Sequence, residues 1–253
     1  MDTELAPDLT EDRLLGGRVR LRQPKVGYRA GLDAGLLAAG CDARPGERVI
    51  DVGCGVGGAM LMASARRYGT TFVGVERDAA ALALARENIG LNEVEDWVVA
   101  LEGDVGQGFR ALGAAPFDVA LCNPPFFDDP GAIRAPHPSR QGAWIADHGL
   151  AAWIGYLLKA VREGGRIFIV HRADRLADLL GLLVPKAGSV QIRPVQPFAD
   201  APAKRVLVRA VKTGKAPLVL LPALVLHERG RLGHARFADA VLAGDAELGW
   251  ETT

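Results

Sequence analysis

Cysteine and long apolar runs are both scarce in this chain of 253 residues. The three cysteines, Cys41, Cys54 and Cys122, are odd in number and widely spaced, which predicts neither a disulfide framework nor a zinc site and favours a reducing cytoplasm. The longest apolar run has nine residues, Leu218–Leu226, whereas a membrane-spanning helix needs about twenty. The acidic start of the chain lacks an apolar core, so no signal peptide is expected.

Histidine clusters and net charge are also lacking. The five histidines form no HxH or HxxxH pattern, so we expect no metal. Thirty basic residues balance thirty acidic ones, which excludes a uniformly basic nucleic-acid coat but not a local basic patch. Residues 13–29 hold six basic and no acidic residues, residues 186–215 hold seven and one, and residues 71–104 hold eight acids. These runs indicate either solvated faces or a one-sided basic patch.

Apolar strand patterns alternate with helical patterns through the middle of the chain. Strands separated by helices of ten or more residues predict an α/β fold with a doubly wound, mostly parallel sheet. A hairpin around Gly16-Gly17 and a helix are expected first, so we divide the chain into an N-terminal addition, 1–45, and a core domain, 46–253. The seven expected strands are 48–52, 71–75, 97–101, 117–122, 166–170, 189–195 and 205–211. The expected helices are 32–41, 59–68, 78–88, 146–161, 174–183 and 237–242.

A glycine-rich loop follows the first of these strands, in Asp51-Val-Gly-Cys-Gly-Val-Gly-Gly58. Glycines let the backbone approach a ligand closely, and the following helix offers unpaired N–H groups. Gly53, Gly55 and Gly57 fit the G-x-G-x-G loop of S-adenosylmethionine (SAM) enzymes, whereas Gly58 as third glycine fits the dinucleotide fingerprint. Asp51 favours SAM, because its carboxylate would attract the methionyl ammonium and repel a pyrophosphate.

Two further acids follow the next strands. Glu76 ends the second strand, where a carboxylate is able to accept hydrogen bonds from both ribose hydroxyls of an adenosine. Asp104 follows the third strand, where it would accept from the adenine amino group, cap a helix, or do both.

The motif Asn123-Pro-Pro-Phe126 stands at the carboxyl end of the fourth strand, where open α/β sheets bind ligands. Pro124 forces Asn123 into an extended conformation. The Asn123 side-chain oxygen and the Pro124 carbonyl then form two rigid acceptors that suit a planar –NH2 group, and Phe126 offers a face on which a base stacks. Acceptors for both N–H groups stabilise the positive charge that develops on nitrogen during methyl transfer.

These two motifs together resemble the Rossmann-like SAM-dependent methyltransferases of exocyclic amines. Residues 10–21 and Gly27-Tyr-Arg-Ala-Gly-Leu-Asp-Ala-Gly-Leu-Leu-Ala38 look like the bacterial tRNA adenine-N6 methyltransferase family, whose best-known members modify the anticodon loop of a valine tRNA. The resemblance covers roughly residues 10–245 and implies that the region of Tyr28 and Asp33 packs over the cofactor. RNA, most simply tRNA, is the implied partner, with the protein as a monomer.

Four alternatives remain at this point. A guanine-N2 rRNA methyltransferase and a protein glutamine N5-methyltransferase use the same Asn-Pro-Pro acceptors. An NAD-dependent oxidoreductase and a non-catalytic RNA-binding module fit less well, because neither needs this acceptor set. If RNA is the substrate, five basic side chains are expected to line the approach to the motif: Arg18, Arg20, Arg22, Arg205 and Arg209.

Overall fold

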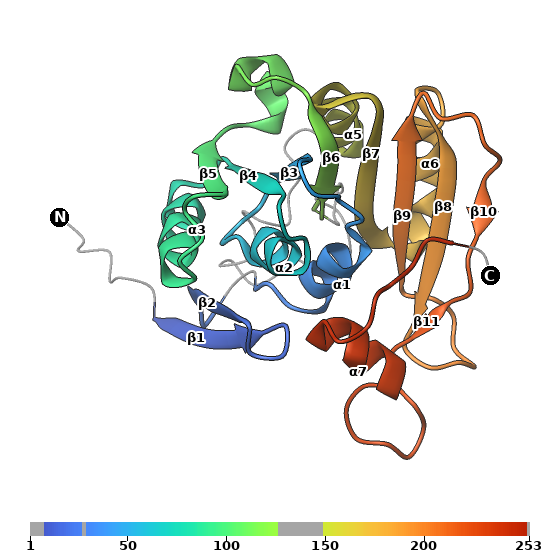
Figure 1. The fold of residues 1–253 in the computed structure, drawn as a ribbon. Helices are drawn as coiled ribbons and strands as arrows, with labels where there is room; N and C mark the ends of the chain where they lie inside the picture. Colours follow the sequence, from blue (N-terminus) through green and yellow to red (C-terminus); the bar gives the residue numbers. More distant parts are fainter. Residues whose placement is uncertain (1–7, 27–28, 126–148, 252–253) are drawn as a thin grey trace.

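The computed structural model describes residues 8–26, 29–125 and 149–251, and its centre is a nine-stranded sheet (Figure 1). The strand order is β10-β8-β9-β7-β6-β3-β4-β5, and β11 also pairs with β8. β9 alone runs antiparallel to its neighbours, so the sheet is mostly parallel. The strands are β3 (Arg48–Val52), β4 (Thr71–Glu76), β5 (Val98–Glu102), β6 (Phe117–Cys122), β7 (Val161–Arg172), β8 (Ala187–Gln196), β9 (Arg205–Lys212), β10 (Val219–Leu220) and β11 (Leu224–Val225).

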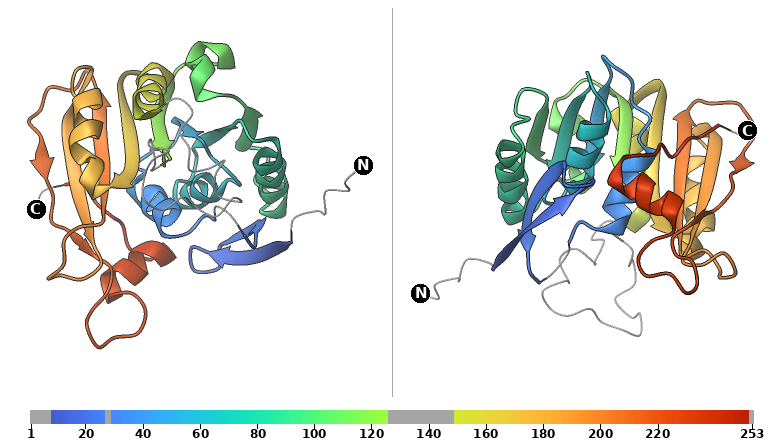
Figure 2. Two further views of the ribbon diagram at one scale, coloured as in Figure 1. Left: turned by 180° about the vertical axis from the view of Figure 1, so that it is seen from behind. Right: turned by 60° about the horizontal axis from the view of Figure 1, so that its bottom comes forward.

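Helices cover both faces of the sheet, as Figures 1 and 2 show. Alternate strand residues enter two separate hydrophobic clusters; Val49 of β3 belongs to one and Ile50 to the other. The first cluster takes in α1 (Leu32–Gly40), α2 (Gly58–Arg66), α3 (Ala79–Leu91) and α7 (Arg236–Ala243). The second takes in α5 (Gly149–Ala160), α6 (Leu176–Leu183) and the short 3-10 helices η1 (Val105–Gln107) and η2 (Phe109–Leu112). A third 3-10 helix, η4 (Ala173–Arg175), precedes α6.

The N-terminal hairpin is tied to the core by Asn88 of α3 and by Asn92, which caps the end of that helix. β1 (Leu9–Leu14) and β2 (Val19–Pro24) form a separate two-stranded antiparallel sheet. Asn88, which is fully buried, accepts from the N–H of Arg22 and donates to the carbonyls of Arg22 and Val56. One turn later, Asn92 accepts from the N–H of Arg20 and donates to its carbonyl. The hairpin is therefore docked by hydrogen bonds to backbone groups on β2.

The fold class expected from the sequence is confirmed, and all seven expected strands are present, with two further short strands. A helix end expected at Gly90 and a helix cap expected from Asp174 are not found. The added strands β10 and β11 both pair with β8, which lies next to the edge of the sheet. Gly90 lies inside α3, whose end at Leu91 is capped by Asn92. Asp174 forms an ion pair with Arg172 instead of capping α6. Of the helix expected over residues 146–161, residues 146–148 lie outside the described residues.

The expected division at residue 45 stays a prediction. Leu36 and Leu37 of α1 are fully buried in the same cluster as Val49 of β3, so α1 shares the core of the sheet. None of the helices in the described part of the chain is long and apolar enough to cross a membrane.

We expect Asn88→Ala to lower the free energy of unfolding by about 2–4 kcal/mol, because the part-buried backbone groups of Arg22 and the buried carbonyl of Val56 lose their partners. Asn92→Ala is the matched control. Its hydrogen bonds to β2 are exposed, so water replaces them at a cost of about 1 kcal/mol or less. Urea unfolding at an unchanged m-value measures both. Equal losses in the two variants would contradict a special role for the buried asparagine.

Candidate cofactor and substrate site

Three neighbouring strands end side by side. Val52 of β3 lies opposite Val75 of β4 and also opposite Cys122 of β6. The residues that follow, Gly53, Glu76 and Asn123, therefore meet at the carboxyl edge of the sheet. This is the edge at which open α/β sheets bind their ligands.

The glycine loop is held by hydrogen bonds to β4. The N–H groups of Gly53 and Cys54 both donate to the carbonyl of Val75, at 2.8 and 3.1 Å. The N–H of Gly55 donates to Oε2 of Glu76 at 2.9 Å. Gly57 has φ 89°, a left-handed conformation that costs little only for glycine, and it caps α2. The loop therefore leads directly into a helix N-terminus, as the sequence predicted.

Trp153 of α5 covers the start of this loop. A Cβ added to Gly53 would lie 2.7 Å from Cη2 of the indole and 2.8 Å from Cζ3. The half-buried ring thus sits directly over the loop expected to bind the cofactor. This contact could not be predicted from the sequence, because an aromatic residue inside an apolar helix is typical of core packing.

Asp51 provides a buried carboxyl group beneath the loop. The residue is 2% exposed, and its Oδ2 has no hydrogen-bond partner among the described residues. Burial, and to a smaller degree the charge of Glu76, raises the pKa of Asp51 to about 7, against the effect of the Met60 backbone. Asp51, Gly53 and Asn123 line one small cavity of about 20 Å³. The structure thus brings the first acid of the cofactor motif and the asparagine of the second motif together.

The other two acids have backbone partners. Glu76 accepts at Oε1 from the N–H groups of Arg77 and Asp78, each at 2.9 Å, and at Oε2 from Gly55. Its carboxylate therefore shapes the loop, and it retains lone pairs for ribose hydroxyls. Asp104 caps η1 by accepting from the N–H of Gly106, so the capping role expected for it is present.

Residues of the second motif are described in part. Asn123 is half-buried and Pro124 is buried directly after β6. Phe126 and Tyr28 lie outside the described residues, so base stacking on Phe126 and cofactor contact by Tyr28 stay predictions.

Asp33, Arg205 and Arg209 are engaged in ion pairs. Both carboxylate oxygens of Asp33, at the start of α1, accept from Nε of Arg205 at 3.2 Å. Arg205 lies opposite Arg172, at the end of β7, and so stands at the carboxyl edge. Arg209 is four residues further along β9 and pairs with Asp42, beyond the end of α1, at 2.9 Å. The structure therefore brings Arg205 to the site edge and does not bring Arg209 there.

The hairpin arginines have acidic partners too. Arg20 and Arg22 both pair with Glu11, at 2.8 and 3.4 Å, and hydrogen bonds from Arg20 foremost lower the pKa of Glu11. Arg18 donates to the carbonyl of Ala243 and pairs with Asp245 at 3.5 Å, beside α7. Their charge is therefore partly balanced within the fold, and the hairpin is not a bare cationic surface.

The residues present fit SAM. A buried carboxylate oxygen with no partner among the described residues suits the cationic methionyl group, and the glycine cradle suits close approach of a ligand. Glu76 and Asp104 follow along the next two strand ends, where an adenosine would extend. Within the described residues, no three potential metal ligands cluster.

Fold and site together define a class I SAM-dependent methyltransferase. Residues 22–135 match the model of the methyltransferase small domain, and SAM is the cofactor of the chain. A predicted O-methyltransferase from Agrobacterium tumefaciens has the same fold, with a TM-score of 0.70, 24% identity, and coverage of 85% of this chain and 97% of that one. A SAM-dependent O-methyltransferase from Thermotoga maritima has a TM-score of 0.53 and 17% identity, covering 76% of this chain and 69% of that one.

Curated relatives confirm the resemblance stated from the motifs. A tRNA1(Val) (adenine(37)-N6)-methyltransferase from Dickeya chrysanthemi is 28% identical over 77% of this chain and 77% of its own length. The protein of the same name from Trichodesmium erythraeum is 26% identical over 78% and 83%. The rRNA N(6)-adenosine-methyltransferase metl-5 of Caenorhabditis elegans is 30% identical over 51% and 53%.

Protonation of Asp51 predicts a pH dependence of cofactor binding. Below a pKa of about 7 the carboxyl of the ligand-free protein is neutral, and a cationic ligand favours its charged form. SAM affinity should therefore rise between about pH 5.5 and 7, a window in which an α-ammonium stays charged, with proton release on binding. Calorimetry in buffers of different ionisation enthalpy measures this release.

Asp51→Asn is the control, and it should bind SAM more weakly and without proton release. The stability of the ligand-free protein changes with pH in the opposite direction to SAM affinity. A raised carboxyl pKa means that the folded state binds the proton more tightly, so stability of the ligand-free protein falls as pH rises from about 4 to 7. The asparagine variant should lack this fall. Proton-independent binding by the wild type would contradict the role of Asp51.

Proposed function

We propose that this methyltransferase modifies the exocyclic N6 amine of adenine in RNA, and that its substrate is the anticodon loop of a tRNA. One observation carries the proposal: Asn123, the first residue of the amine-binding motif, lines the same cavity as Asp51 and Gly53 of the cofactor loop. Cofactor and target amine would therefore meet at one point of the carboxyl edge.

Asn123 and Pro124 act on the amine. The exocyclic nitrogen of adenine is a poor nucleophile, because its lone pair is delocalised into the ring. Acceptance of its two hydrogens by the Asn123 side chain and the Pro124 carbonyl returns electron density to nitrogen and stabilises its developing positive charge. Bound SAM supplies a methyl group on a positively charged sulfur. Transfer of that methyl group to N6 would leave the amine with one surplus proton, which would pass from the acceptor pair to solvent.

The rigid placement of the two acceptors indicates that their main contribution to the rate is to orient the amine. Pro124 is buried directly after β6, and prolines fix φ, so the pair of acceptors is held by the end of a strand. Holding the amine in line with the reacting groups contributes a large share of the rate enhancement in such transfers. Phe126 completes this arrangement in the proposal by stacking on the flat face of the base.

Names of the relatives support adenine in RNA over the other amines. Matches covering three quarters of this chain are tRNA adenine-N6 enzymes, and a shorter match acts on rRNA adenosine. An anticodon loop presents unstacked bases, so extruding an adenine into the site costs less than from a duplex. The proposal includes a cytoplasmic, monomeric enzyme.

We expect Asn123→Ala to lower kcat by about a hundredfold or more while SAM affinity stays near that of the wild type, because Asn123 acts on the target amine. Labelled SAM and total bacterial tRNA, followed by nucleoside analysis, measure the rate and identify the product. N6-methyladenosine is the expected product. Methylguanosine, or label in a protein extract and not in RNA, would overturn the adenine assignment, and a near-normal rate would remove Asn123 from the mechanism.

A further inference from the structure

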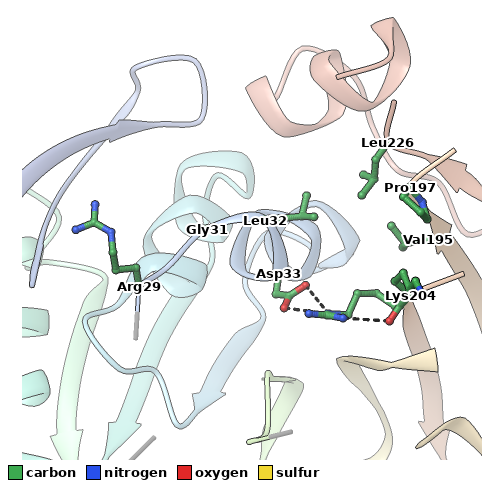
Figure 3. A pocket seen from close by; sticks show the side chains of 9 residues that line it. Arg29, Gly31, Leu32, Asp33, Val195, Pro197, Lys204 and Leu226 are labelled. Atoms are coloured by element: carbon green, nitrogen blue, oxygen red, sulfur yellow. Dashed lines mark hydrogen bonds and ion pairs between the residues drawn. The ribbon is translucent and has the colours of Figure 1, made fainter. Parts of the chain in front are cut away.

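A second cavity lies beside the proposed site, on the other side of α1. It has a volume of about 280 Å³ and lies between the start of α1 and the ends of β8 and β9. In Figure 3, Leu32 and Asp33 of α1 face Val195, Pro197 and Lys204 across it, whereas Arg29 lies apart. Because β8 ends and β9 begins at the carboxyl edge, this cavity opens at the same edge as the amine-binding motif.

One wall of the cavity carries cations with different partners. Lys204 is exposed, and its ammonium makes no ion pair with any described residue. Arg205 is held by Asp33 through Nε and by the Lys204 carbonyl through Nη1, at 3.1 Å. Asp33 thus orients Arg205, and Lys204 leaves a positive charge at the cavity that is available to an anion.

Apolar side chains line both sides of the cavity. Leu32 is half-buried, and Val195 and Leu226 are buried, with Pro197 between the strand ends. A cation beside apolar side chains matches a phosphate joined to a sugar and base. The volume of about 280 Å³ stands near the lower limit of small-ligand pockets, which suits one nucleotide rather than a long segment.

Rings and cations continue from this rim. Phe198 follows Pro197, and His227 follows Leu226; their ring centroids are 5.8 Å apart. His234 stacks on His227 at 5.1 Å, and the Arg229 guanidinium, which pairs with Asp200, lies 4.8 Å from the centre of the Phe198 ring. Interleaved aromatic and basic side chains are typical of surfaces that bind single-stranded nucleic acid. They extend the lining of the cavity outward.

We propose that this cavity holds a nucleotide adjacent to the methylated adenine, with its phosphate on Lys204 and its base and sugar against Leu32, Pro197 and Leu226. This inference rests on the proposed RNA substrate and deepens it. It also explains the role of the Asp33–Arg205 ion pair, which holds Arg205 in place without adding an unpaired negative charge to the cavity.

Lys204→Ala tests the assignment against Lys186→Ala. Lys186 is also an exposed lysine with no ion pair to described residues, but it precedes β8 at the opposite end of the sheet. We expect Lys204→Ala to raise KM for total bacterial tRNA about five- to tenfold, with kcat and SAM affinity unchanged. The log–log salt slope should fall by a little under one. Lys186→Ala should have the wild-type KM and salt slope, and the KM of Lys204→Arg should be close to that of the wild type.

Each other outcome is decisive. If the wild type methylates tRNA and Lys204→Ala behaves as Lys186→Ala does, the cavity is not a nucleotide site, and the proposed function stands. If Lys204→Ala loses SAM affinity, the cavity serves the cofactor and the inference is overturned. If the wild type labels protein and no RNA, the proposed function fails, and the inference fails with it.

Discussion

Close packing around the glycine loop is the constraint on which the rest of the site depends. Gly53 lies under the Trp153 ring, at a distance that leaves no room for a Cβ, and Gly58 meets Ala30 just as tightly. The loop is therefore enclosed by α5 on one side and by the segment leading into α1 on the other. Asp51 is buried beneath it, and this burial keeps the pKa of its carboxyl near 7. The conformation of the loop and the raised pKa of Asp51 thus both depend on close packing around the loop.

Charge is divided along the carboxyl edge in a way that suits two ligands of opposite sign. Asp51, Glu76 and Asp104 stand at the ends of β3, β4 and β5, where a cationic cofactor with an adenosine would lie. Lys204 and Arg205 stand at the start of β9, beyond β6 and β7. Asn123 follows β6, between the two groups. An anion arriving at the basic end is thereby separated from the acids, which would repel it.

Local patterns predicted the scaffold and the cofactor loop well, because each depends on neighbours in the chain. β3 and β6 have the expected bounds, and Asp78 caps α3 as a side chain at that position should. Contacts between distant segments were not predictable in this way. Asp33 and Arg205 are 172 residues apart, and Trp153 of α5 contacts Gly53 from 100 residues further along the chain. Gly90 marks the helix end only approximately, since α3 continues to Leu91 and is capped by Asn92.

The hairpin arginines show why the number of basic residues in a segment does not give the charge of the surface that it forms. Glu11 lies directly opposite Arg22 in the hairpin register, so pairing across the strands balances charges that look unopposed along the sequence. Arg67 and Arg166 are balanced in the same manner by Glu247 and Asp42. Many basic side chains are thus paired with acids within the fold. A net charge of zero is therefore compatible with an RNA substrate. What attracts a phosphate is a cation without an internal partner at the place where the phosphate must lie, and Lys204 meets that condition among the described residues.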